Sequence, residues 1–215
     1  YYSSLIIVLR NFDRLLEKPS ARLPDDLWLL AYPQGYWQSI STAARRSGLD
    51  PFLVAAIIRE ESQFRAEALS PAGARGVMQV MPATGEWIAK LNGIRDFDRA
   101  KLFEADMNIA IGTLYLGQLM KRFRNDLVLV SAAYNAGPEA VTGWTSRNGT
   151  SSDPDTFVET IPYMETRGYV KKVLRNYAEY RRIYGRANGS AALPAPADTA
   201  AVKAETRLCS KATER

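Results

Sequence analysis

From Tyr36 onward, apolar residues recur at helical spacing in one segment after another, and no segment shows the sustained apolar–polar alternation of a β-strand. The longest stretches without a helical pattern are 65–82, 92–105 and 146–164. We therefore predict an all-α domain. The spacing, together with residues that start and end helices, predicts helices over 36–47, 51–64, 83–91, 106–122, 126–135, 138–145 and 165–184.

A separate helical segment precedes this region. Residues 3–18 have the pattern of an amphipathic helix that ends at Pro19, because a proline cannot continue a helix. Residues 19–35 then form a connector with a short helical piece around 26–30. We interpret residues 1–35 as a helical lead-in, the end of a truncated N-terminal helical domain.

Residues 36–185 form the main predicted domain, with Gly185 closing its last helix. Residues 186–215 are rich in Ala and Pro and too poor in hydrophobic residues to fold, which predicts a flexible tail. The chain begins at Tyr1 rather than Met. We therefore expect a fragment or processed form, with the targeting signal outside this sequence.

Glu61 is the residue of the predicted helix at 51–64 that fits its surroundings least. Asp50 can cap the start of this helix, and Pro51 suits its first position. At roughly 100° per residue, Glu61 falls about 20° from the mean direction of the apolar stripe, and Glu60 about 80° from it. Glu60 is therefore expected to face water, whereas Glu61 must face the interior or a cleft.

A carboxyl group in such a position has two interpretations. Desolvation penalises the charged form, so the pKa of Glu61 is expected to rise, and a carboxyl that stays protonated near neutral pH can act as a general acid. The alternative is a buried glutamate paired with one of the many arginines. The helix alone favours neither.

The composition removes most other catalytic chemistries. The chain has no histidine, which excludes a Ser-His-Asp triad, a Cys-His pair and an imidazole metal site. Its single cysteine, Cys209, lies in the predicted tail and is a poor candidate for a nucleophile. Chemistry must come from carboxylates, hydroxyls, amides, Lys or Tyr. We expect no metal and no cofactor.

The charge suggests partners without identifying one. The net charge is +5 and the pI about 9.3, which suits nucleic acid, an anionic membrane surface or an acidic polymer such as a cell wall. Lys and Arg are spread over predicted helix faces rather than gathered in a run, so we expect no nucleic-acid binding. No stretch approaches the roughly 20 apolar residues of a transmembrane helix, and 3–9 lacks the basic leader of a signal peptide.

Four segments stand out when they are taken together. They are Ile58–Phe64 with Ser70–Ala74, Arg75–Gly85, Ala132–Pro138 and Phe157–Val170. Their order and spacing closely resemble the catalytic domain of the soluble lytic transglycosylases, lysozyme-like enzymes that cut bacterial peptidoglycan. The resemblance covers roughly 36–184 and implies a lysozyme-like helical fold, goose-type lysozyme included. The segment at 30–33 is similar to that family's lead-in from a large helical N-terminal domain.

The second segment offers candidate sugar contacts. Gly76 lets the backbone run close to a groove, and Gln79 can offer a donor and an acceptor to a sugar amide or hydroxyl. Methionines can pack on sugar faces or fill the core, and we favour the core for Met78 and the groove for Met81. Ser70 precedes a proline and is typical of a turn, but the resemblance implies that it reaches the acetamido group of the substrate.

The third and fourth segments add residues beside Glu61. Tyr134 and Asn135 lie near a helix end and can line the cleft, and the resemblance implies that Tyr134 lies against the catalytic acid and helps to place its carboxyl. For Asn135 we favour a cap on helix-end carbonyls. Glu165 suits the first turn of the last helix, and the resemblance adds contact with cationic stem-peptide groups. We expect Glu159 to pair with an arginine.

The resemblance also implies a mechanism with a single protein carboxyl. Glu61 protonates the glycosidic oxygen between N-acetylmuramic acid and N-acetylglucosamine, the substrate's acetamido oxygen attacks the anomeric carbon, and Glu61 then removes the proton of the muramic acid 6-hydroxyl. The product is a 1,6-anhydro end formed without water. The implied partners are peptidoglycan glycan strands and stem peptides, met by a monomer in the bacterial periplasm or cell envelope.

Two other functions fit the same residues. A hydrolase of the same fold needs a second carboxylate to activate water, for which Asp96 or Asp98 are candidates. A non-catalytic peptidoglycan-binding or secretion-assembly module can retain the fold without the chemistry.

Overall fold

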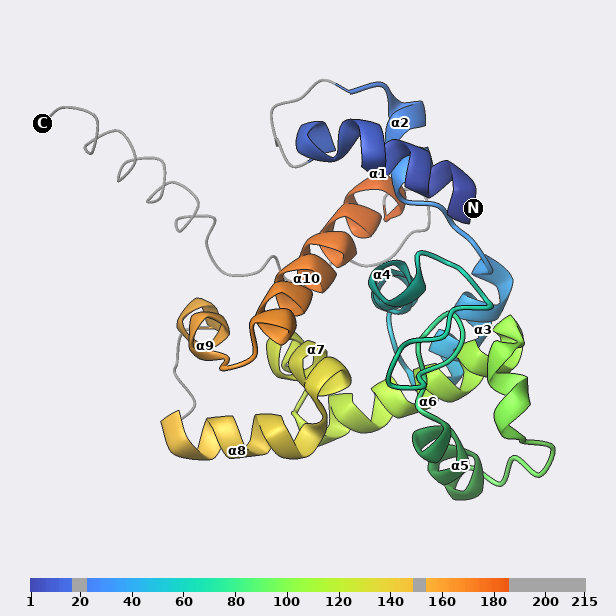
Figure 1. The fold of residues 1–215 in the computed structure, drawn as a ribbon, viewed down its shortest axis with the longest axis vertical. Helices are drawn as coiled ribbons and strands as arrows, with labels where there is room; N and C mark the ends of the chain where they lie inside the picture. Colours follow the sequence, from blue (N-terminus) through green and yellow to red (C-terminus); the bar gives the residue numbers. More distant parts are fainter. Residues whose placement is uncertain (17–22, 149–153, 186–215) are drawn as a thin grey trace, which may run out of the picture. The chain divides into compact units, whose positions relative to one another are not determined.

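The computed structural model describes residues 1–16, 23–148 and 154–185 (Figure 1). Within these ranges every regular element is a helix, and the only β-type pairs are isolated bridges from Arg75 to Leu69 and to Val80, so the all-α prediction is confirmed. The predicted tail, Cys209 and the expected helix end at Pro19 lie outside the described residues. None of the helices in the described ranges combines the length and apolar character that a membrane span requires.

Each helix expected from the sequence is present, with its ends shifted by a few residues at most. Two elements were missed, the short helix η1 inside the stretch 92–105 and α9 inside 146–164. Both are too short for a periodic pattern to stand out. The elements are α1 (Tyr2–Leu16), α2 (Asp25–Ala31), α3 (Trp37–Ser47), α4 (Pro51–Ser62), α5 (Pro82–Leu91), η1 (Arg99–Phe103), α6 (Ala105–Arg122), α7 (Leu127–Ala136), α8 (Pro138–Asn148), α9 (Pro154–Thr160) and α10 (Met164–Tyr184).

Helix α4 is the most deeply buried element, with every residue from Phe52 to Arg59 buried. Its start follows from local chemistry, because the Asp50 side chain accepts a hydrogen bond of 2.9 Å from the Phe52 amide and Pro51 occupies the first turn. The preceding helix ends at Gly48, whose positive φ of 66° suits a glycine.

Arg59 is buried inside this helical core. Its Nε donates to the Ala31 carbonyl at 2.9 Å and its Nη1 to Asn176 Oδ1 at 2.7 Å, while the guanidinium lies 4.4 Å from the centre of the Tyr32 ring. One side chain therefore connects α4 to α2 and to α10. These contacts hold the end of α4, where Glu61 lies, against the last helix.

Several helices pack against α4 or α6. Helix α3 contacts both of them, and α6 also contacts α5, η1 and α7. Figure 1 shows α4 seen nearly end-on, with α10 to one side and α6 crossing below it. Gly137 ends α7 and Pro138 begins α8, as the sequence predicts.

Candidate active site

Glu61 lies in the last turn of α4, and its carboxyl faces α10. The Tyr169 hydroxyl donates a hydrogen bond of 2.6 Å to Glu61 Oε1. The pKa of Glu61 is raised from its ordinary value of 4.5 to about 8, mainly by burial. The Tyr169 hydrogen bond opposes this rise, and the negative charges of Glu60 and Glu165 add to it. At neutral pH the carboxyl therefore keeps its proton.

The alternative interpretation of Glu61 as half of an ion pair is wrong. Among the described residues Glu61 forms no ion pair with an arginine, and its partner is the neutral phenol of Tyr169. Glu60 was expected to face water, but its side chain is only 18% exposed and pairs with Lys172 Nζ at 3.0 Å. Because α10 packs alongside this part of α4, both neighbouring carboxyls are in contact with the last helix.

Tyr134 lies close enough to Glu61 for the carboxylate charge to act on its phenol. Burial, and then the charge of Glu61, raise the pKa of Tyr134 well above its ordinary value. Its hydroxyl, however, donates to the Met78 carbonyl at 2.9 Å, which fastens α7 to the loop before α5. The hydroxyl that donates to the Glu61 carboxyl is that of Tyr169, a residue that sequence reasoning did not single out although it lies four residues after Glu165 on α10.

Asn108 of α6 holds the loop at 75–80 in place through hydrogen bonds to its backbone. Its Oδ1 accepts a hydrogen bond of 2.8 Å from the Met78 amide, and its Nδ2 donates to the carbonyls of Arg75 at 2.7 Å and Leu102 at 2.8 Å. Gly76 packs so closely that a Cβ there would lie 2.1 Å from the Leu102 carbonyl oxygen, which explains the glycine. Asn108 was not predicted, because nothing in its sequence context distinguishes it from any other helical asparagine.

Gln79 lies at the tip of this loop with a positive φ of 48°. Its side-chain Nε2 donates to the carbonyls of Ala68 at 3.1 Å and Gly76 at 2.8 Å. The two amide hydrogens are thus used inside the loop, and the expectation that Gln79 offers a donor to a ligand is wrong. Its Oε1 remains as the acceptor, and the side chain lines the groove described next.

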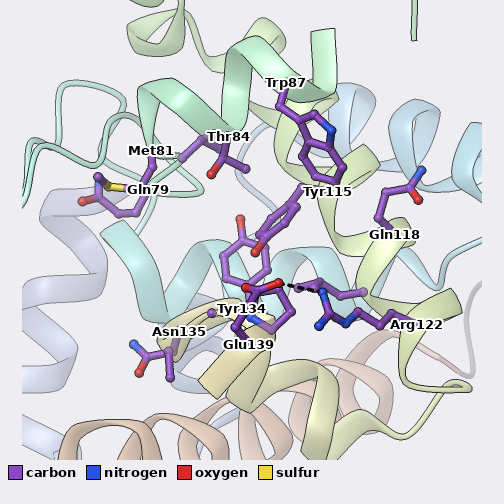
Figure 2. Close-up of a pocket in the computed structure, with 15 residues that line it drawn as sticks. Gln79, Met81, Thr84, Trp87, Tyr115, Gln118, Arg122, Tyr134, Asn135 and Glu139 are labelled. Atoms are coloured by element: carbon purple, nitrogen blue, oxygen red, sulfur yellow. Dashed lines mark hydrogen bonds and ion pairs between the residues drawn. The ribbon is translucent and has the colours of Figure 1, made fainter. Parts of the chain in front are cut away.

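A groove of about 680 Å³ runs between α5, α6 and the α7–α8 junction (Figure 2). The predicted division of the methionines is confirmed, since Met81 is 41% exposed and lines the groove whereas Met78 is fully buried. Glu61 itself is not among the lining residues, but its neighbour Tyr134 is. The groove is lined by Gln79, Val80, Met81, Thr84, Trp87, Tyr115, Gln118, Leu119, Arg122, Tyr134, Asn135, Ala136, Gly137, Pro138 and Glu139.

Three aromatic side chains that line this groove contact one another in a row, Trp87, Tyr115 and Tyr134. The Trp87 and Tyr115 rings meet edge to face at 6.5 Å between centroids, and the Tyr115 and Tyr134 rings lie 5.5 Å apart. Tyr134 in turn neighbours Glu61. Sequence reasoning missed Trp87 and Tyr115, because their helical positions do not distinguish a groove from the core.

Asn135 lines the groove as expected, but its expected capping role is wrong. Its Oδ1 accepts a hydrogen bond of 2.6 Å from the Thr166 hydroxyl, which connects α7 to α10. The helix ends instead at Gly137, whose amide donates to the Ala133 carbonyl at 3.0 Å. Glycine without a side chain suffices for this cap.

Ser70 closes a tight turn outside the groove. Its Oγ accepts a hydrogen bond of 3.0 Å from the Ala74 amide, and its carbonyl accepts one of 2.9 Å from the Gly73 amide. The turn interpretation of Ser70 is therefore confirmed, while its contact with a substrate stays a prediction.

The other acidic residues have separate roles. Glu165 is exposed in the first turn of α10, and its charge reaches Glu61. Glu159 pairs with an arginine as expected, Arg167 at 3.9 Å, and more closely with Lys171 at 2.5 Å. In the described ranges, no three His, Cys, Asp or Glu side chains gather as a metal ion would require.

Asp96 and Asp98, the candidates for a second carboxylate, do not line the groove. Asp96 pairs with Lys101 at 2.6 Å, and the Asp98 side chain caps η1 by accepting from the Ala100 amide at 2.5 Å. The carboxylate that does line the groove is Glu139, which pairs with Arg122 at 2.9 Å.

Comparisons with known sequences agree on one family. The profile described as the Transglycosylase SLT domain matches residues 38–157, and that of the soluble lytic transglycosylase helical domain matches residues 160–188. The soluble lytic murein transglycosylase of Salmonella typhimurium is 39% identical over 156 residues, which cover 72% of this chain and 24% of that protein. The protein of the same name from Escherichia coli K12 is 43% identical over 131 residues, 60% of this chain and 20% of that protein.

Solved structures give the same result. The crystal structure of an inactive mutant of the lytic transglycosylase Slt from Pseudomonas aeruginosa has a TM-score of 0.72 and 33% identity, covering 86% of this chain and 30% of that one. The 70 kDa soluble lytic transglycosylase of Escherichia coli has a TM-score of 0.72 and 37% identity over 74% of this chain and 26% of its own. The chain thus spans about a quarter or less of the length of the two curated relatives named above.

Proposed function

Because the chain belongs to the Transglycosylase SLT domain family, we propose that it is a bacterial peptidoglycan lytic transglycosylase, a lyase that cleaves the β-1,4 bond between N-acetylmuramic acid and N-acetylglucosamine. Residues 36–185 form its catalytic domain, and residues 1–35 are the end of a larger helical domain. The enzyme acts on glycan strands in the periplasm or cell envelope.

The observation that carries this proposal is the state of Glu61. Its pKa of about 8 keeps the carboxyl protonated at neutral pH, and its hydrogen bond to Tyr169 fixes one carboxyl oxygen. Tyr134, a neighbour of Glu61, lines a groove of about 680 Å³, a volume within the usual range of ligand sites. A protonated carboxyl fixed beside a groove is what a general acid requires.

The proposed reaction uses Glu61 twice. Its proton passes to the glycosidic oxygen as the bond from that oxygen to C1 of muramic acid breaks, and the acetamido oxygen of the same sugar bonds to C1. The resulting Glu61 carboxylate then takes the proton of the 6-hydroxyl. The 6-oxygen bonds to C1 as the acetamido oxygen leaves, so the 1,6-anhydro ring closes and Glu61 is again protonated.

A hydrolytic reaction of the same fold is the competing proposal. It needs a second carboxylate that activates water beside the sugar. Asp96 and Asp98 are used elsewhere, and Glu139 is held by Arg122, whose hydrogen bond lowers the pKa of its carboxyl. The positions of these carboxylates support a mechanism that needs Glu61 alone.

The substrate contacts we propose follow from position. Met81 packs on a sugar face, while Gln79 Oε1 accepts from a sugar amide or hydroxyl. Asn135 lines the same groove, and Ser70 contacts an acetamido group from its turn. The exposed carboxylate of Glu165 receives cationic groups of the stem peptide.

Comparison of Glu61→Gln with the wild-type protein on purified sacculi tests the proposal. We expect the variant to bind sacculi as well as the wild type and to release no soluble muropeptides, because the amide cannot give up a proton. Equal release by both proteins would refute the assignment of Glu61. Binding without release by both would identify a peptidoglycan-binding module instead.

A further inference from the structure

Trp87 is a large aromatic residue that lies exposed at the groove instead of packing in the core. Its side chain is 51% exposed although indole is one of the larger apolar groups, and it lines the groove rather than the core. Thr84 and Trp87 project from α5, and Met81 from the position just before it, along one side of the groove, as Figure 2 shows. The helix therefore presents an apolar strip to whatever enters.

The Trp87 ring has one aromatic neighbour, Tyr115, among its ring contacts in the described residues. The Tyr115 ring meets it edge to face, at 6.5 Å between centroids and an interplanar angle of 81°, and Tyr115 itself packs on Tyr134. The backbone of α5 is fixed, since a Cβ on Gly85 would lie 2.7 Å from the Phe97 ring. A rigid aromatic ring loses little conformational entropy when a ligand stacks on it, which favours binding.

The far side of the groove is polar. Gln118, Arg122 and Glu139 line it, and the Arg122–Glu139 pair, at 2.9 Å, joins α6 to α8 there. Figure 2 shows these three side chains across the groove from the strip on α5. One aromatic wall and one polar wall match the two surfaces of a pyranose ring, whose C–H groups form an apolar face and whose hydroxyl groups lie around its edge.

We propose that Trp87 is a carbohydrate-stacking residue that binds a sugar ring of the glycan strand away from the bond to be cleaved. The aromatic row Trp87–Tyr115–Tyr134 separates it from Glu61, so it contacts the strand without touching the reacting atoms. This inference rests on the proposed function, because it takes the groove to be the path of the substrate. In this proposal Trp87 increases the affinity of the protein for long glycan strands and takes no part in the chemical steps.

The test measures binding in the Glu61→Gln background, where no turnover interferes. The probe is the β-1,4-linked hexamer of N-acetylglucosamine, titrated by calorimetry. We expect Trp87→Ala to weaken binding on the order of tenfold and Trp87→Phe to retain most of it. The control is Leu91→Ala, which removes another exposed side chain (54%) of α5 that does not line the groove. It should bind the hexamer as the parent does.

A second measurement separates stacking from a structural effect. The hexamer should change the tryptophan fluorescence of the parent, and the Trp87→Phe variant should lose most of that change because its other tryptophans lie outside the groove. Unchanged hexamer affinity in Trp87→Ala would overturn the inference.

The inference and the proposed function can fail separately. If the wild-type protein digests sacculi but Trp87→Ala binds the hexamer normally, only the role of Trp87 is refuted. If Trp87 proves necessary for hexamer binding but sacculi are not digested, the groove is a carbohydrate site and the proposed catalytic function is refuted.

Discussion

The hydroxyl of Tyr169 lies 2.6 Å from Oε1 of Glu61, and this hydrogen bond joins the end of α4 to the last helix. The two residues are 108 positions apart in the sequence. The bond stabilises the ionised carboxyl, whereas burial destabilises it, and burial has the larger effect. Glu61 therefore keeps its proton near neutral pH while one of its oxygens is held in place.

The pH dependence of the wild-type enzyme should reflect this state. Glu61 must carry a proton when substrate binds, so kcat/KM should be flat below its pKa of about 8 and fall about tenfold per pH unit above it. The rate of muropeptide release from sacculi, measured at low substrate, checks this. Loss of activity already above pH 5 would show an ordinary carboxyl and contradict the account.

Removal of the Tyr169 hydroxyl should shift the dependence of kcat/KM on pH. In Tyr169→Phe the ionised carboxyl loses its hydrogen bond, so the pKa of Glu61 rises and the alkaline limb shifts to higher pH. We also expect kcat at neutral pH to fall on the order of tenfold, because the carboxyl is less well held.

The matched control for this variant is Tyr177→Phe. Tyr177 also lies on α10 and donates a hydrogen bond of 2.8 Å to a carboxylate, that of Asp50. It should leave both the profile and kcat unchanged. An alkaline limb of Tyr169→Phe at the wild-type pH, or below it, would mean that the hydrogen bond does not stabilise the carboxylate.

The raised pKa of Glu61 should also be visible, without any substrate, in how the free energy of unfolding depends on pH. Between pH 4.5 and about 8 the folded protein keeps the Glu61 proton and the unfolded chain does not, so this group lowers stability as pH rises through that window. Glu61→Gln removes the effect. The variant should be more stable than wild type at pH 7, by roughly 3 kcal/mol, and equal to it near pH 4. Urea unfolding at the two pH values checks this, and the same difference at both would be inconsistent with a raised pKa.

Asn108 is predicted to stabilise the fold, because its side chain holds the loop at 75–80. Asn108→Ala leaves the Met78 amide and the Leu102 carbonyl without their partner and removes one of the two hydrogen bonds to the Arg75 carbonyl, which should cost roughly 3–5 kcal/mol. Asn92→Ala, which removes one part-buried hydrogen bond to the Ile88 carbonyl on α5, should cost less than about 1 kcal/mol. Similar unfolding free energies for the two variants would show that Asn108 does not hold the loop.

Local patterns were enough to predict most of the fold. The helical spacing and caps located the helices, because Asp50, Pro51 and Gly137 act within one turn of their own sequence positions. The burial of Glu61 followed from its place on the helical wheel. The elements that were missed, η1 and α9, are shorter than the repeat that such a pattern needs.

The partners of the site residues could not be predicted in the same way. Tyr169, Thr166 and Asn108 act across helices that are far apart in the sequence, so no local spacing marks them. Asn135 was misassigned for this reason, since its partner lies on α10 rather than at its own helix end. The exposed ring of Trp87 depends on how α5 packs against α6, which a single helix does not reveal.

The central claim is that Glu61 closes a 1,6-anhydro ring without water, and the mass of the products tests it most directly. Purified sacculi digested by the wild-type protein should yield muropeptides whose masses match 1,6-anhydro-muramic acid ends, while Glu61→Gln yields none. Products that are heavier by one water molecule would contradict the claim and identify the enzyme as a hydrolase of the same fold.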